Sequence, residues 1–202
     1  MKRKKWILTA LVMWIVIFLL NGCSTTMKLK YTKPPIDTLN RIDKGTISVI
    51  VNDRRLPEEG KNDRTRVGTI RNTFGVPFPL RADADRQPPK VIKDLVSDCL
   101  KASGFEVVES SNNVAHLIVD LRSFWSDGYQ YNKMYVAMIT ELKNNPNASP
   151  VWSYELKSDA AVPWTIGYGQ IDKGFTKLLE DAKKKLMAQF ESSEFHNSFK
   201  AF

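Results

Sequence analysis

The sequence is poor in the residues on which most site chemistry depends. Its 202 residues include two cysteines, Cys23 and Cys99, and two histidines, His116 and His196. Two cysteines exclude a disulfide-dense scaffold and a four-cysteine metal site. Two histidines leave little for a histidine metal centre or a catalytic triad. The nucleophile elbow GxSxG, the zinc motif HExxH, the P-loop and the dinucleotide motif GxGxxG are also missing. We therefore expect a protein that is not an enzyme and has no metal and no cofactor.

Size and composition are those of one globular domain. The chain is 43% hydrophobic and 26% charged, which excludes disorder as its main state. A chain of 202 residues is long enough to bury a core. We found no internal repeat and no low-complexity segment.

The first 20 residues form a basic start followed by an apolar run. Residues 1–5 read MKRKK, and residues 6–20 contain Thr9 as their only polar residue. As a helix this run would span about 22 Å, whereas a bilayer core is about 30 Å thick. A basic start before a short apolar run is typical of an export signal. The alternatives are a buried helix, which would show a polar face, and an uncleaved anchor, for which the run is short.

The residues that follow, Leu20-Asn21-Gly22-Cys23, resemble a bacterial lipobox. Gly22 and Leu20 fit the pattern, whereas Asn21 departs from the usual small or aliphatic residue. The resemblance implies that residues 1–22 are removed and that Cys23 becomes the acylated first residue. Ser24, rather than Asp, follows the cysteine, which in enterobacteria favours sorting to the outer membrane. Two or three acyl chains hold a protein on a membrane essentially permanently, whereas one chain does so only marginally.

Removal of the signal also changes the charge. Residues 1–22 hold four positive charges and no acidic residue, so the formal net charge falls from +8 to +4. A mildly basic remainder is no argument for nucleic acid as a partner. We expect the membrane, through acylated Cys23, and an envelope protein or the cell wall as partners; the oligomeric state is left open.

We divide the chain into a signal peptide (1–22), the lipidated cysteine with a flexible tether (23–45) and a single α/β domain (46–202). The tether is polar, has no apolar period and is interrupted by Pro34-Pro35. Its lysines could rest on anionic headgroups, although we favour a solvated spacer.

Apolar periodicity within the domain predicts six strands, two helices and a long irregular segment. Each helix has one apolar stripe, which in the first contains Cys99 and predicts that this thiol is buried. We expect an α/β two-layer sandwich, with a mixed β-sheet of about five or six strands and two amphipathic helices on one face. The strands are expected at 46–52, 67–71, 105–109, 115–124, 129–142 and 151–158, the helices at 90–103 and 170–191, and the irregular segment at 72–89.

Among the remaining polar and aromatic residues, none forms a catalytic pattern. His116 lies in an apolar strand and fits a structural role better than that of a general base. His196 lies in the tail, where a surface or docking role is expected. Trp125, Trp164 and Tyr168 are in or near turns, and we take them as a candidate partner or ligand surface.

The chain resembles the YajG-type bacterial lipoproteins from about Thr46 to Phe195. The resemblance rests on Asp53-Arg54-Arg55, VGTIRNTFG (67–75), VIKDLVSDCLKASGFEVV (91–108), HLIVDLRSF (116–124) and the closing segment from Ile171 to Phe195. It implies a small α/β lipoprotein of the Gram-negative envelope and supplies no catalytic residue.

Three functions remain open. The first is a non-enzymatic lipoprotein, anchored in the outer membrane facing the periplasm, that binds or scaffolds envelope partners. The second is an accessory carrier for a lipid or a peptidoglycan fragment, with residues 72–89 and 164–168 around an apolar cleft. The third, a hydrolase without a visible motif, is the weakest.

Overall fold

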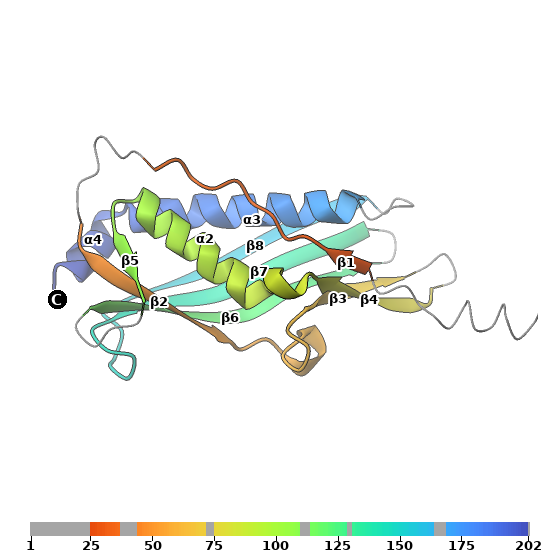
Figure 1. Ribbon diagram of the computed structural model, residues 1–202, viewed down its shortest axis with the longest axis horizontal. Helices are drawn as coiled ribbons and strands as arrows, with labels where there is room; N and C mark the ends of the chain where they lie inside the picture. The colour runs from red at the N-terminus through yellow and green to blue at the C-terminus, as the bar shows by residue number, and fades with distance from the viewer. Residues whose placement is uncertain are drawn as a thin grey trace, which may run out of the picture.

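The computed structural model describes residues 25–36, 44–71, 75–109, 114–128, 131–163 and 169–201. Within these ranges a mixed eight-stranded sheet curls as a half-barrel and is accompanied by three α-helices (Figure 1). None of the described helices combines the length and apolar character needed to cross a bilayer. The strands are β1 (Thr25–Met27), β2 (Thr46–Asp53), β3 (Arg66–Arg71), β4 (Pro77–Ala82), β5 (Glu106–Val108), β6 (Ala115–Gly128), β7 (Tyr131–Lys143) and β8 (Trp152–Pro163), and the helices are α2 (Pro88–Ala102), α3 (Gly169–Phe190) and α4 (Ser193–Phe199).

Strand β6 organises the sheet because both of its edges are paired. One edge pairs antiparallel with β7, which in turn pairs with β8. The other edge is shared by two strands: β2 pairs in parallel with residues 115–121, and β3 pairs in parallel with residues 126–128. Beyond β2 lies β5, and beyond β3 lie β4 and β1. The sheet therefore forks along β6, and the chain must leave this edge after β2 and return to it as β3.

Arg55 holds the loop that makes this excursion. Its side chain is fully buried, and its guanidinium forms a two-point ion pair with Asp53, with Nε at 2.9 Å from Oδ1 and Nη2 at 2.8 Å from Oδ2. The remaining N–H groups donate to the backbone carbonyls of Glu59, Gly60, Arg64 and Arg66. Such a planar fork suits arginine and not lysine. One buried side chain thus satisfies carbonyls along the whole loop between β2 and β3.

Gly60 completes this loop. Its φ of +110° lies in the left-handed region, and a Cβ there would stand 2.6 Å from the carbonyl oxygen of Arg66. Only glycine meets both conditions without strain.

The two long helices share one apolar core with the sheet. Phe175 of α3 stacks on Phe124 of β6 with ring centroids 5.3 Å apart, and the Cys99 thiol of α2 points at the Lys183 carbonyl of α3. The predicted apolar stripes of both helices are confirmed as buried. They consist of Val91, Ile92, Leu95, Val96, Cys99 and Leu100 in α2, and of Ile171, Phe175, Leu178, Leu179, Ala182, Leu186 and Phe190 in α3.

The α/β class and the mixed sheet agree with the prediction, but the expectation of five or six strands is wrong. The expected irregular segment at 72–89 contains β4, a 3-10 turn at Ala84–Arg86 and the first residues of α2. Prolines concealed the strand: Pro77 and Pro79 pair with β3, but both lie outside the stretch of β4 that pairs with β1. Proline is tolerated there because an edge needs no N–H donor.

The expected flexible tether is also wrong for residues 25–36. Thr25–Met27 form β1, which pairs in parallel with β4. Met27 and Leu29 are buried in the core, at 4% and 0% exposure. These two apolar side chains alternate with polar neighbours, which is the pattern of a strand with one buried face. The prediction of a tether considered only the polar character of the segment and missed this alternation. Residues 37–43 lie outside the described part of the chain.

The tail forms a further helix, α4, that covers one end of the core. Ser192 caps it by accepting a hydrogen bond from the Phe195 amide at 3.2 Å. Phe195 is fully buried and packs edge-on against Phe105 and Trp152. His196, for which a surface or docking role is expected, stacks on Phe105 with ring centroids 5.8 Å apart and lies beside Lys44, with Nε2 and Nζ 3.0 Å apart.

We predict that Arg55→Met destabilises the protein by about 3–5 kcal/mol, because it leaves the Asp53 carboxylate buried without its partner. Arg54→Met is the matched control, since Arg54 is exposed, and should change stability by less than about 0.5 kcal/mol. Urea unfolding followed by circular dichroism measures both. Equal stability of the two variants would contradict the role assigned to Arg55.

Candidate functional site

The segment after β1 forms a strap across the two long helices. We call residues 28–36 the strap; in Figure 1 it runs in orange past α2 and α3. Its Thr32 amide donates to Glu180 at 2.5 Å, and Lys183 donates to the Thr32 carbonyl at 2.9 Å. Arg86 donates two hydrogen bonds, at 3.1 and 2.8 Å, to the Leu29 carbonyl. The strap is therefore bound at several points along its length.

Tyr31 ties the strap to α2. Its phenol donates to Asp98 Oδ2 at 2.9 Å, and Lys33 lies 3.6 Å from the same oxygen. Burial, and then the neighbouring Asp98 carboxylate, raise the pKa of Tyr31, so the phenol stays protonated and remains a donor.

A polar cleft of about 430 Å³ opens beside this contact. The strap, α2 and the residues of β5 with Glu109 provide its walls. Its charged side chains carry both signs, and Arg86 and Asp94 within it stand 3.6 Å apart. The lining consists of Tyr31, Lys33, Arg86, Lys93, Asp94, Ser97, Asp98, Lys101, Val107, Val108 and Glu109.

The chemistry that this cleft offers is binding through charge and hydrogen bonds. Its volume is within the range of small-molecule sites, but its lining is mostly polar, whereas sites for apolar ligands are lined by apolar side chains. Lys93 and Lys101 present ammonium groups, and Asp94 and Glu109 present carboxylates. Within the described ranges no group of three His, Cys, Asp or Glu side chains could hold a metal ion.

Ser48 and His116 form the contact that most resembles catalytic chemistry. Ser48 Oγ and His116 Nδ1 are 2.6 Å apart on neighbouring strands β2 and β6. The two residues are only 1% and 2% exposed, so no substrate reaches the hydroxyl. Burial lowers the pKa of His116, which keeps the imidazole neutral at neutral pH. This geometry fits the structural role expected of His116.

Cys99 is likewise closed off. It is a free, fully buried thiol in α2, as the stripe predicted. Burial raises its pKa to about 12, with the Asp98 carboxylate adding to the shift. A thiol of such pKa is a poor nucleophile.

The aromatic residues chosen from the sequence do not come together as an observed surface. Trp125 is only 9% exposed, because β6 turns it toward Arg66, whose guanidinium lies 5.3 Å from the ring centroid. Trp125 therefore offers little of its ring to a partner or ligand. Trp164, Tyr168 and the lipidation residue Cys23 lie outside the described residues.

The cleft residues were missed for two reasons. Tyr31 and Lys33 fall in the segment interpreted as a tether, and Lys93, Asp94 and Lys101 looked like an ordinary solvated helix face. The one available signal was the alternation of Met27, Leu29 and Tyr31, which indicates a segment bound along one face.

We predict that Tyr31→Phe loosens the strap, because Asp98 loses a hydrogen bond of about 1–2 kcal/mol. Hydrogen exchange of the Thr32 amide should accelerate roughly tenfold. The free energy of unfolding should fall by about 1–2 kcal/mol, the contribution of the lost hydrogen bond. Tyr135→Phe is the matched control, since its phenol lies 3.4 Å from Glu59 at an exposed position and should have little effect. Unchanged exchange at Thr32 would show that the phenol does not hold the strap.

Comparison with known proteins places the chain by its fold. No family model and no curated protein matches it. A minor lipoprotein from Acinetobacter baumannii is 8% identical, with 72% of this chain and 91% of its own covered at a TM-score of 0.42. A DUF330 protein from Xanthomonas campestris is 14% identical, with 88% of this chain and 99% of its own covered at a TM-score of 0.58. The chain is therefore similar in fold to this bacterial DUF330 protein over almost all of that protein's length.

Proposed function

We propose that the protein is a lipid-anchored lipoprotein of the Gram-negative envelope, of the YajG type, with a non-enzymatic binding or scaffolding role. The observation that carries the proposal is the sequence Leu20-Asn21-Gly22-Cys23 after a basic, apolar leader. Its place in the fold supports it, because Cys23 precedes the first described strand by two residues. An acyl group on this cysteine would leave the whole described domain intact.

The burial of the side chains that could act in catalysis supports a binding role for the protein rather than an enzymatic one. Ser48, His116 and Cys99 are buried, and the cleft beside the strap contains ion pairs and hydrogen bonds rather than an activated nucleophile. The similarity in fold to a DUF330 protein adds no reaction. We further propose the outer membrane as the location, because Ser24 rather than Asp follows the cysteine.

We predict that Cys23→Ser abolishes incorporation of a fatty-acid analogue and releases the protein from the membrane fraction. Cys99→Ser is the matched control: it removes the other cysteine, which is buried in α2, and should leave labelling and membrane association unchanged. Density-gradient fractionation of the same cells reports which membrane holds the wild type. Labelling of Cys23→Ser at the wild-type level would refute the proposal.

The second candidate, a carrier, is favoured by the mixed charge of the cleft. A peptidoglycan fragment carries carboxylates, an ammonium group and sugar hydroxyls, which complement Lys93, Lys101, Asp94 and Glu109. An acyl chain has no such complement in this cleft. Of the two ligands considered for a carrier, the structure therefore favours the peptidoglycan fragment.

We predict that a disaccharide–tetrapeptide muropeptide shifts the amide resonances of α2 and the strap. Lys93→Ala combined with Lys101→Ala should weaken this binding roughly tenfold, equivalent to about 1.4 kcal/mol. Lys177→Ala, at an exposed position of α3, serves as control. If a lysophospholipid shifts the same resonances equally, or the muropeptide shifts none, the assignment of a peptidoglycan fragment as the ligand of this cleft fails.

A further inference from the structure

The point at which the acyl chains would attach is only two residues from a described strand. Thr25–Met27 pair with residues 80–82 of β4, and Met27 and Leu29 are buried. Consecutive Cα atoms are 3.8 Å apart, so the Cα of Cys23 is at most about 7.6 Å from that of Thr25 in any conformation. A flexible linker of ~20 residues would instead allow roughly 25 Å. The domain therefore has almost no freedom to stand away from an acylated Cys23.

Strand register identifies the part of the domain that lies at this attachment point. β1 runs parallel to β4, so both begin at the same end of the sheet. Pro77 pairs with Arg71 at that end, and the neighbouring Ile70 pairs with Gly128. Across the next strands, Gly128 of β6 pairs with Asn132 of β7, and Tyr131 of β7 pairs with Pro163 of β8, so these residues form one row across the end of the sheet. We call this row the anchor end.

The opposite end of the domain holds α4 and the turn between β7 and β8. Figure 1 shows β1, β3 and β4 at one end of the long axis and α4 at the other.

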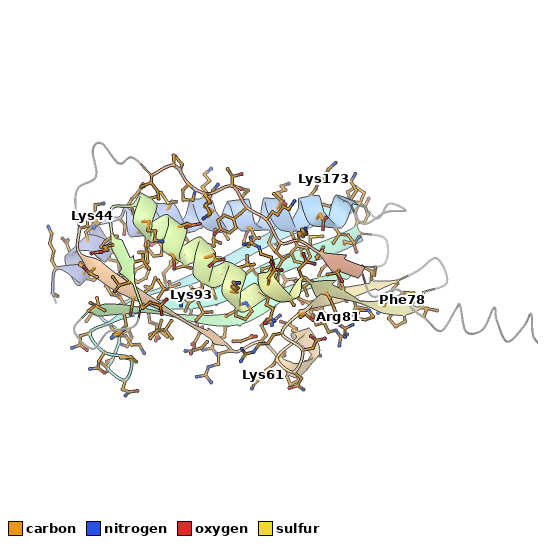
Figure 2. All side chains as sticks on the ribbon, viewed as in Figure 1. Lys44, Lys61, Phe78, Arg81, Lys93 and Lys173 are labelled. Carbon is orange, nitrogen blue, oxygen red and sulfur yellow. The ribbon has the colours of Figure 1, made fainter. Side chains whose placement is uncertain are left out.

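Two of the exposed large apolar side chains lie at the anchor end. Tyr131 is 59% exposed and Val76 is 48% exposed, while Leu56 and Val151 are comparably exposed elsewhere in the domain. Pro77 and Pro163 are exposed beside them, and Phe78 is half-buried at the tip in Figure 2. Tyrosine and small apolar groups suit the headgroup region of a bilayer, where one side of the contact is wet.

The charges around these side chains permit such a contact. Arg71, Lys133 and Lys173 lie at or beside the anchor end, and Lys173 is labelled there in Figure 2. Asp127 and Asp172 are the acidic neighbours. The basic side chains thus outnumber the acidic ones at this end.

We propose that the acylated protein does not extend on a tether but docks its anchor end, through Val76, Pro77 and Tyr131, on the headgroups of the bilayer that holds it. This inference rests on the proposed lipidation of Cys23. The contact is small, and a free domain would not stay bound through it. A leash of two residues raises the local concentration of membrane so far that even a weak contact is populated.

Docking has a consequence for the cleft. α2 runs from Pro88 near the anchor end toward the opposite end, and the cleft lies along it. The docked domain would stand with its long axis pointing away from the membrane surface and present the cleft at a set height, instead of sampling all orientations.

The test uses full acylated protein, with both acylation and cleavage verified by intact mass, in vesicles of phosphatidylethanolamine and phosphatidylglycerol. Val76→Cys and Val151→Cys are labelled with the fluorophore NBD. They form a matched pair, since both valines are 48% exposed and stand at opposite ends of the sheet. The native thiol, Cys99, is buried and does not react.

With nitroxide-labelled headgroups in the vesicles, quenching at residue 76 should exceed that at residue 151 at least threefold. Tyr131→Glu in the Val76→Cys background should reduce this ratio toward one while the protein stays acylated and co-sediments with vesicles. Equal quenching at both positions in protein of verified acylation overturns the docking and leaves the proposed function intact. Absence of the acyl group from the native protein refutes the proposed function instead.

Discussion

The ion pair between Asp53 and Arg55 is the interaction on which the remainder of the structure depends. β6 can accept both β2 and β3 on one edge only if the intervening loop leaves the sheet and returns in register. The Arg55 guanidinium closes that loop by binding Asp53 on one side and the carbonyls of residues 59–66 on the other. A buried charge of this kind is costly unless all its hydrogen bonds are made, and here they are. β3, β4 and β1 then follow from the position at which the loop returns the chain.

This dependence extends to the proposed attachment to a membrane. β1 exists because β4 offers it an edge, and β4 lies where it does because β3 occupies the second half of β6. The strap continues from β1 and binds both long helices through Tyr31 and Thr32. A pull on the N-terminal end would therefore act on the sheet and on both helices together. The same strap forms one wall of the polar cleft, so the anchoring segment and the candidate binding site share residues.

The organisation of polar groups separates structure from function in this domain. Ser48, His116 and Arg55 are fully or almost fully buried and paired, and their hydrogen bonds hold strands and a loop in place. The charged groups of the cleft, by contrast, include partly solvated, loose pairs such as Arg86–Asp94 at 3.6 Å. Loose, solvated pairs contribute little to stability and can exchange partners with a ligand at small cost. This contrast is the physical basis for proposing a binding role, with the cleft as its site.

Sequence alone determined the local properties of the chain: the basic and apolar start before Cys23, the apolar stripes of α2 and α3, the burial of Cys99, and the strands β2, β3 and β5 to β8. These follow from periodicity and from residue types that need no distant partner. Tertiary structure alone decided the rest. Prolines at 77 and 79 oppose a strand by propensity, yet β4 forms because β3 supplies its hydrogen bonds. Residues 25–36 look like a linker, yet they are ordered by a strand edge and by Asp98 and Glu180, more than 60 residues away. Long-range pairing of this kind leaves no periodic trace in the sequence, and it is what places the anchor, the strap and the cleft.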